Sequence, residues 1–246
     1  MYNVKFKSQE EWENFQKLAK LGQLYLLEKN EKQFSNKTTR EIFTTIYEKQ
    51  MWGKSIEGFH SGPGTHDKEP SEIYVKAVSS WLKEFSDQLV GVDLGCGDFH
   101  IGYQLFDKFK KFVACDIVEA LIERNKKKFE HPDLLFMQLD LTKDELPDGD
   151  IVFVRQVFQH LSNELIEKSI RRIEKKYKYL VLSEHLPHQK DFRKNVDKPS
   201  GWLTRIGIGS AIDITEPPFN LSFQDMFEIC SIPHGGGFIT TTVFEF

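Results

Sequence analysis

Hydrophobic side chains near the start of the chain recur every three or four residues, which is the spacing of one helix face. Between residues 8 and 30 this face consists of Trp12, Phe15, Leu18, Leu21 and Leu24. Between residues 38 and 52 a second face consists of Ile42, Phe43, Ile46 and Tyr47. No strand pattern separates the two stretches, so we expect them to form a helical cap. The Gly-, Pro-, Ser- and His-rich stretch that follows, at 53–70, is expected to be a loop.

Short apolar runs alternate with amphipathic stretches along the rest of the chain. Strands are expected at 89–94, 111–118, 134–141, 150–157, 178–186, 225–232 and 238–246. Helices are expected at 71–85, after Asp98, at 119–129 and at 162–177, the last with Ser162 as its N-cap. Such alternation is typical of parallel βαβ units, whereas the last two strands, joined by PHGGG, would form an antiparallel hairpin. The pattern predicts an α/β fold: a doubly wound, seven-stranded, mostly parallel sheet with an N-terminal helical cap.

Composition narrows the class of protein. Of the 246 residues, 39% are hydrophobic, which supports a sizeable core and argues against a disordered chain. The net charge of −4 argues against a nucleic-acid-binding protein. The three cysteines lie far apart without metal-ligand spacing, and their odd number suits a reducing cytoplasm. No apolar run reaches the roughly 18–20 residues of a membrane span, and the first residues lack the apolar core of a signal peptide. We expect a cytoplasmic protein, monomeric or homodimeric, without a metal, a nucleic-acid partner or a membrane span.

The stretch LVGVDLGCGDFHIG suggests a ligand site at the first strand-to-helix turn. Gly95 and Gly97 allow a tight turn and a close approach of backbone to a ligand. Asp116 ends the second strand roughly 20 residues downstream, where a carboxylate can bind ribose hydroxyls. Asp140 ends the third strand and would reach the exocyclic amine of an adenine. Each of these residues also has a purely structural explanation, as a tight turn, a helix cap or a loop.

Two residues argue against a dinucleotide at this turn. The third glycine of the dinucleotide fingerprint is replaced by His100, and Asp93 lies where a pyrophosphate would be repelled. A cationic ligand without phosphate fits better, and S-adenosylmethionine combines an adenosine, a sulfonium and an amino-acid tail.

The motifs VDLGCGD, ACDIV, MQLDL and DIVFVRQVFQHLS resemble, in this order, those of class I S-adenosylmethionine-dependent methyltransferases. The resemblance covers about residues 89–246 and implies a Rossmann-like methyltransferase domain at 70–246, preceded by a helical cap and lid loop at 1–69. It implies S-adenosylmethionine as the cofactor, bound by Trp52, Ser61, Gly62, Asp93, Gly95, Gly97, Asp116, Ile117, Asp140, Leu141, Arg155 and Gln156. The sequence departs from the family pattern at Phe99, where many members have a glycine.

A narrower resemblance adds MWGK, SGPGT, DIVEALIERN, RQVFQHLS, GW and DITEPPF. Together they are similar to a bacterial subgroup often encoded with capsule and lipopolysaccharide genes. This resemblance implies a lid loop around Ser61, Gly62 and Gly64. Between Gly201 and Pro217 the sequence carries extra residues relative to that subgroup.

Side chains at the ends of the fourth and fifth strands are candidates for the chemistry. His160, Glu184 and His185 are rival general bases, since each would lie at the ligand edge of the sheet. His160 is explained equally well as a satisfied histidine beside the next helix. Arg155 would pair with the methionine carboxylate or an anionic acceptor, or form a surface salt bridge.

The polar loop at 191–217 is expected to bind the acceptor. Trp202 would stack on a sugar, Arg193 and Arg205 would hold phosphate, and Asp213 would bind substrate. These residues and the subgroup resemblance favour O-methylation of a sugar or phosphorylated precursor of a surface polysaccharide. N-methylation of a small metabolite and binding of S-adenosylmethionine without catalysis are the alternatives; a nicotinamide oxidoreductase is disfavoured by Asp93 and His100. His60 and His66 would suit a metal, but the sequence shows no partner cluster for them.

Overall fold

The computed structural model describes residues 9–56, 58–85, 88–189 and 191–246. Its helices are α1 Gln9–Phe34, α2 Thr39–Glu48, α3 Pro63–His66, α4 Lys68–Leu82, α5 Glu119–Lys128 and α6 Asn163–Ile173. Short 3-10 turns occur at 102–104, 106–108, 158–160 and 206–208. The predicted helical cap corresponds to α1 and α2. None of the helices in the described ranges has the length and apolarity needed to cross a membrane.

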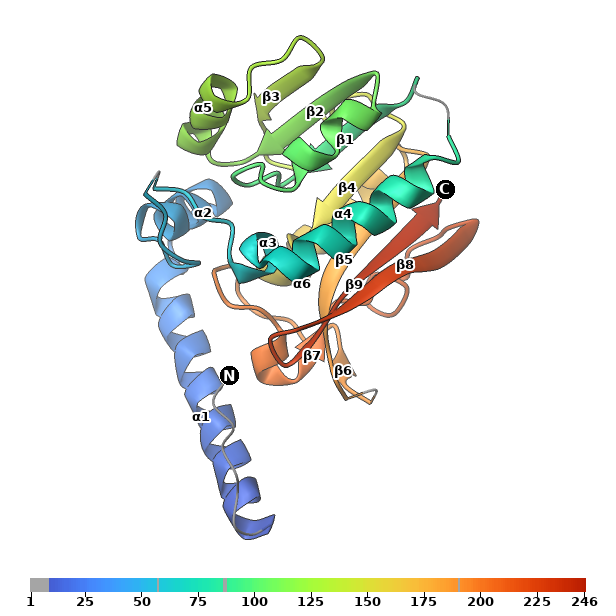
Figure 1. Ribbon diagram of the computed structural model, residues 1–246. Coiled ribbons are helices and arrows are strands. Elements are labelled where there is room, and N and C mark those ends of the chain that lie inside the picture. Colours follow the sequence, from blue (N-terminus) through green and yellow to red (C-terminus); the bar gives the residue numbers. More distant parts are fainter. Residues whose placement is uncertain (1–8, 57, 86–87, 190) are drawn as a thin grey trace.

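Helix α1 projects away from the body of the molecule (Figure 1). Leu21 and Leu24 on its predicted face are exposed, so these two side chains are not covered by the described residues. The predicted face also includes residues that lie outside the described side chains: Trp12, Phe15 and Leu18. Ser8, where we expected the helix to begin, lies outside the described residues as well.

Helix α2 forms where expected, and its predicted apolar face is buried. Thr38 and Glu41 form a capping box at its first turn, because each side chain accepts a hydrogen bond from the other residue's backbone N–H. Ser162 is the N-cap of α6, as predicted, but its side chain makes no capping hydrogen bond; the Asn163 N–H donates to the carboxylate of Asp197.

Seven strands form one sheet in the order β3-β2-β1-β4-β5-β9-β8. They are β1 Val90–Leu94, β2 Lys111–Asp116, β3 Leu134–Gln138, β4 Ile151–Arg155, β5 Tyr179–Pro187, β8 Asp225–His234 and β9 Gly237–Glu245. The first five are parallel, β9 is antiparallel to β5, and β8 is antiparallel to β9. This order reverses direction beside β1, which is where open α/β sheets bind ligands. The predicted fold class is confirmed.

Each face of the sheet carries its own hydrophobic core. Val152 and Val154 of β4 pack in the core that includes α6, whereas Ile151 and Phe153 pack in the core that includes α4. Figure 1 shows α4 lying across one face of the sheet. Because both faces are covered, the central strands are continuously apolar rather than alternating.

Three local expectations were wrong. The residues after Asp98 form only the two 3-10 turns at 102–104 and 106–108, not a helix. Helix α4 spans Lys68–Leu82 rather than the expected 71–85. The loop after β5 contains a two-stranded sheet, β6 Arg193–Lys194 with β7 Ser210–Ala211. The division into two domains stays a prediction.

Candidate functional site

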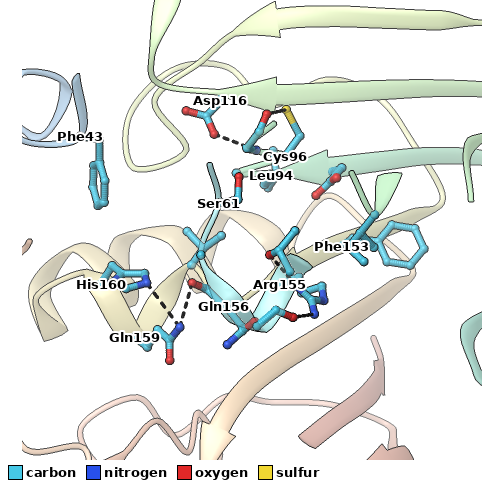
Figure 2. Close-up of a pocket in the computed structure, with 18 of the residues that line it drawn as sticks. Phe43, Ser61, Leu94, Cys96, Asp116, Phe153, Arg155, Gln156, Gln159 and His160 are labelled. Atoms are coloured by element: carbon cyan, nitrogen blue, oxygen red, sulfur yellow. Dashed lines mark hydrogen bonds between the residues drawn. The ribbon is translucent and has the colours of Figure 1, made fainter. Parts of the chain in front are cut away.

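A cavity lies at the carboxyl ends of β1, β2, β4 and β5, and is covered by α2 and the segment before α4. Figure 2 shows Asp116 and Ser61 on one side of this pocket and Gln159 and His160 on the other. The cavity contacts all twelve residues for which a cofactor role was expected: Trp52, Ser61, Gly62, Asp93, Gly95, Gly97, Asp116, Ile117, Asp140, Leu141, Arg155 and Gln156.

The turn after β1 requires its two glycines. Gly95 and Gly97 have φ of 86° and 55°, conformations that residues with a side chain rarely adopt. A Cβ at Gly95 would collide with Val157, and one at Gly97 would collide with Ser61. The N–H groups of Gly95 and Cys96 both donate to the Cys115 carbonyl, which fixes the turn against β2.

Asp116 lies directly beside this turn, as its spacing predicted. Its two carboxylate oxygens accept the backbone N–H groups of Gly97 and Val118, at 3.1 and 3.0 Å. Burial raises the pKa of Asp116 to about 6. A carboxylate oxygen can accept more than one hydrogen bond, so Asp116 retains capacity for ligand hydroxyls.

Asp93 is the carboxylate at the cavity that lacks a hydrogen bond. No donor in the described part of the chain bonds its side chain, and burial raises its pKa to about 7. Asp116 adds to this increase, while the guanidinium of Arg155 opposes it. A half-buried carboxylate without a partner is stabilised by a cationic ligand.

The carboxylate of Asp140 interacts with residues of the turn that follows it. Its Oδ1 accepts both the N–H and the hydroxyl of Thr142, and its Oδ2 lies 3.4 Å from Lys143 Nζ. Leu141 follows it along the cavity wall. Both oxygens of Asp140 therefore already have partners in the turn. A contact of Asp140 with an adenine amine stays a prediction.

Arg155 holds the polypeptide that covers the cavity. Its Nη1 donates to Thr65 Oγ1 and its Nη2 to the Gly64 carbonyl, at 3.0 and 2.6 Å, and its guanidinium lies over the ring of Tyr74. Gln156, at a φ of 55°, packs against Gly64, where a Cβ would collide with its side chain. Arg155 thus uses two of its five N–H donors on this cover, while its buried Nε has no hydrogen-bond partner.

We call residues 58–67 the lid segment. Ser61 and Asp98 are joined twice, because Ser61 N–H donates to Asp98 Oδ2 and Asp98 N–H donates to Ser61 Oγ, both at 2.9 Å. His66 Nε2 lies 2.6 Å from the same Asp98 oxygen. Burial acts to raise the pKa of Asp98, but His66 and neighbouring N–H groups outweigh it and lower that pKa. Asp98 thus fastens the lid segment to the glycine turn.

Asp98 was missed by the sequence analysis, although it is the last residue of LGCGD. The rings of His60 and His66 stack with their centroids 4.2 Å apart, and the ring centroids of His66 and His100 are 4.7 Å apart. Asp98 is thus a partner for His66, which the sequence did not show. Within the described residues no His, Cys, Asp and Glu side chains are grouped as metal ligands.

The three candidate bases have different surroundings. His160 lines the cavity and packs against Trp52, with ring centroids 4.8 Å apart. Burial lowers the pKa of His160 to about 3, so the ring is neutral and a weak base. His185 also lines the cavity, and its Nε2 lies 2.8 Å from the His234 carbonyl. A carbonyl only accepts, so Nε2 carries the proton and Nδ1 keeps its lone pair.

Glu184 is not placed as a base. It is absent from the cavity wall and accepts the N–H of Phe158. Burial raises the pKa of Glu184 to about 8, although Arg205 opposes this increase. The alternation of β5 turns successive side chains to opposite faces, so Glu184 and His185 cannot both point to the cavity.

Of the residues expected to bind substrate, some line the cavity and others do not. Trp202 lines the cavity, and its carbonyl accepts Trp52 Nε1–H at 3.1 Å. Arg193 and Asp213 lie outside the cavity lining; Arg193 is exposed, and Asp213 pairs with Lys194 at 2.9 Å.

The phosphate-binding role expected for Arg205 was wrong. The side chain is 1% exposed. Its guanidinium makes five hydrogen bonds, to the carbonyls of Val196, Phe158, Gln159 and Leu161 and to Asn163 Oδ1. All five donors of an arginine are therefore used inside the protein. Sequence reasoning saw a cation in a polar loop and had no signal for its burial.

The polar residues of the cavity wall that were not anticipated include Gln159, Thr204 and His234. Gln159 is 5% exposed, and its Oε1 has no hydrogen-bond partner. His234 belongs to the β8–β9 hairpin, so only the fold brings it to the site.

Residues 92–178 match the family described as "Methyltransferase domain". No curated protein sequence matches the chain. Magnesium protoporphyrin IX methyltransferase from Synechocystis PCC 6803, with bound S-adenosylhomocysteine, has a TM-score of 0.54 at 14% identity, over 84% of this chain and 99% of that one. The N-methyltransferase NodS from Bradyrhizobium japonicum WM9, with the same ligand, has a TM-score of 0.51 at 12% identity, over 73% and 89%.

Human N-acetylserotonin methyltransferase, in complex with S-adenosylmethionine, has a TM-score of 0.52 at 16% identity. The match covers 85% of this chain and 59% of the human chain. At these identities the structural matches show a shared fold. They include enzymes with unlike acceptors, and nothing in them supports the polysaccharide-associated subgroup.

Proposed function

We propose, on the premise that residues 92–178 are a methyltransferase domain, that this protein is an S-adenosylmethionine-dependent methyltransferase acting on a small polar acceptor. The observation that carries the proposal is a glycine turn beside two carboxylates, of which one is hydrogen-bonded to the backbone and the other has no hydrogen bond. Asp116 lies beside the turn and Asp93 faces the cavity without a hydrogen bond. The matched structures that contain S-adenosylmethionine or its demethylated product support the same ligand.

The residues present fit this cofactor. The absence of Cβ atoms at Gly95 and Gly97 leaves a smooth wall, and Asp116 can accept ribose hydroxyls. Asp93 supplies the negative charge that a sulfonium and an ammonium require. The cofactor, when bound, supplies an already activated methyl group, so this chain mainly has to position the acceptor and exclude water. Trp52 and the lid segment cover the site for that purpose.

His185 is the base that the geometry supports best. The His234 carbonyl fixes the tautomer that leaves Nδ1 unprotonated. As an acceptor oxygen takes the methyl group, His185 Nδ1 accepts the hydroxyl proton. Burial, which lowers the pKa of His185, also keeps the ring neutral and ready to accept a proton near pH 7.

For the acceptor, we keep O-methylation of a sugar-like compound as the proposal. Trp202 lines the cavity, and an indole ring suits stacking on a sugar face. A phosphorylated acceptor has lost its support, because Arg205 is fully engaged and Arg193 lies outside the cavity.

Binding calorimetry tests the proposal. The protein should bind S-adenosylmethionine and S-adenosylhomocysteine but not NAD. Since Asp93 has a raised pKa of about 7 and must be ionised to hold a cation, the Kd for S-adenosylmethionine should rise about tenfold from pH 8 to pH 6. Asp93→Asn should bind more weakly and lose most of this pH dependence. Tight NAD binding without either sulfur compound would refute the function.

A further inference from the structure

Two consecutive residues at the end of the lid segment contact two different parts of the site. His66 Nε2 lies 2.6 Å from Asp98 beside the glycine turn, whereas Asp67 Oδ2 lies 3.2 Å from His234 Nε2 on the β8–β9 hairpin. A carboxylate only accepts, so His234 Nε2 donates to Asp67. One peptide unit therefore joins the glycine turn to the hairpin that bonds His185.

His234 contacts the proposed base through its own backbone. Its carbonyl accepts the His185 Nε2–H at 2.8 Å, and the centroids of the two rings are 5.4 Å apart. The other ring nitrogen of His234, Nδ1, is buried and has no hydrogen-bond partner in the described part of the chain. Asp67 therefore provides the hydrogen bond that fixes the His234 ring, and that ring shares its residue with the carbonyl that holds His185.

The backbone next to His234 has little rigidity of its own. β8 ends at His234 and β9 begins at Gly237, so the turn between them consists of Gly235 and Gly236, both at positive φ. Glycine restricts its backbone less than other residues do. β8 is also the edge strand of the described sheet, so β9 alone bonds it there. A Cβ at Gly235 would lie 3.6 Å from His185 Cε1, which shows that this turn lies against the base.

Helix α4 brings Asp67 to the hairpin. The helix follows Asp67 directly and packs along β8, where Trp81 near its other end is in ring contact with Phe227. Asp67 lies outside the cavity lining, and its side chain makes no capping hydrogen bond to α4. Neither helix capping nor contact with a ligand explains this carboxylate.

We infer that Asp67 is a positioning residue: through His234 it holds the β8–β9 turn so that His185 keeps its proton at Nε2 and its lone pair at Nδ1. This inference rests on the proposed function, in which His185 Nδ1 accepts the hydroxyl proton of the acceptor. Because His66 and Asp67 are consecutive, the segment that covers the cofactor also sets the base. A base held out of position loses rate even where the ligands still bind.

Paired variants at Asp67 test the inference. Asp67→Ala removes the acceptor of the His234 Nε2–H, whereas Asp67→Asn keeps an oxygen that accepts it. Glu69→Ala, at an exposed carboxylate in the first turn of α4 and outside the cavity lining, is the matched control. The backbone of Asp67 has a φ of −65° and a ψ of 122°, which suit any residue. All three variants should therefore fold and melt within a few degrees of wild type.

The first readout is the exchange of the His185 Nε2–H proton with water. It is followed by NMR on protein with isotope-labelled histidine, and the signal is assigned by its loss in His185→Gln. We expect Asp67→Ala to speed this exchange about tenfold, and Asp67→Asn and Glu69→Ala to stay within about threefold of wild type. A tenfold change corresponds to about 1.4 kcal/mol, the size of one hydrogen bond. Unchanged exchange in Asp67→Ala overturns the inference.

The second readout is methyl transfer from S-adenosylmethionine to the methyl glycosides of glucose, galactose and mannose, followed by mass spectrometry. Asp67→Ala should lower kcat about tenfold and leave KM and the Kd for S-adenosylhomocysteine within about threefold of wild type. In a His234→Phe background Asp67→Ala should cause no further loss, because its effect passes through the His234 ring. Additive losses, or an equal loss in Asp67→Asn, overturn the inference.

Failure of the proposed function gives different results. Wild type that does not bind S-adenosylhomocysteine would overturn that function, and transfer to none of the three glycosides would overturn its sugar-like acceptor. The proton exchange at His185 needs neither ligand, so it tests the role of Asp67 in both cases.

Discussion

At the scale of single residues, Phe99 stands where the methyltransferase pattern that the sequence resembles often has a glycine. It has a φ of 62°, a conformation that favours glycine, yet it is fully buried. Its ring packs against Phe112, Phe129 and Phe136. Gly102 leaves the space for this ring, since a Cβ there would collide with it. The strain is retained because the ring fills a core.

Phe99→Gly should therefore destabilise the protein. Loss of a buried phenyl ring costs about 3–5 kcal/mol, and relief of the backbone strain returns about 1 kcal/mol. A net loss of about 2–4 kcal/mol in the free energy of unfolding is expected from urea denaturation. A more stable variant would show that the glycine conformation dominates at this position.

His160 should make stability depend on pH. Its folded pKa of about 3 lies below the ordinary value, so its contribution is complete above about pH 6.5 and is lost as the pH falls. Between pH 7.5 and pH 5 wild type should lose about 2 kcal/mol more than His160→Asn, because the unfolded histidine takes up a proton and the folded one does not. Urea denaturation at the two pH values measures this difference. If wild type and His160→Asn lost the same free energy of unfolding between pH 7.5 and pH 5, His160 would not be buried in the neutral state.

His185 and Glu184 make a matched pair of variants. His185→Gln should lower kcat about 10²- to 10⁴-fold, because it removes a base at the cavity. Glu184→Gln should change kcat less than tenfold, since its pKa of about 8 already leaves the carboxyl protonated near pH 7 and a glutamine keeps its shape. The measurement is the turnover of any accepted glycoside, and a reversed order would make Glu184 the base.

Sequence spacing located the residues whose role depends on the main chain. Gly95, Gly97 and Asp116 follow from strand ends, and the cavity contacts all three. Side chains whose role depends on burial were not predictable. Arg205 is a cation in a polar loop by sequence, and only the fold turns it inward onto four carbonyls.

At the scale of elements, Asp98 and Arg155 fasten the lid segment, which contains the short helix α3, to the sheet. Asp98→Asn should weaken its closure, because His66 loses a charged partner and the pKa of His66, raised by that hydrogen bond, should fall. We expect the dissociation rate of S-adenosylhomocysteine to rise about tenfold, measured by stopped-flow fluorescence. Asp107→Asn, at an exposed position away from the cavity, is the control. An unchanged rate would mean that the lid segment stays closed without Asp98.

The central strands were predictable because each is a short apolar run bounded by polar residues, and both of their faces are buried. The helix expected after Asp98 was not found, because Phe99 leaves the helical region and its ring takes the space beside Gly102. The helix propensity of Phe99 could not show this, because the cause is the packing of its ring against β2 and β3.

At the scale of the whole molecule, Arg205 joins the loop after β5 to the segment after β4. Its hydrogen bonds run from Val196 to Asn163, and Glu184 accepts the Phe158 N–H in the same region. Arg205→Met should lower the free energy of unfolding by about 3–5 kcal/mol, since several buried carbonyls lose their donors.

Circular dichroism during heating measures this loss. Arg193→Met, at an exposed arginine of β6, should unfold within a degree or two of wild type. Equal melting temperatures for the two variants would contradict the structural role of Arg205.

The 3-10 turns after Asp98 have an electrostatic consequence for ligand choice. In dinucleotide-binding folds the first turn leads into a long helix, whose macrodipole places partial positive charge against a pyrophosphate. Residues 102–108 provide no such aligned peptide array. The carboxylates of Asp93 and Asp116, which line the same cavity as Gly95 and Gly97, then act without an opposing helix dipole. Discrimination between a cationic nucleoside and a doubly negative pyrophosphate therefore depends on these carboxylates together with a backbone path that offers no opposing helix dipole.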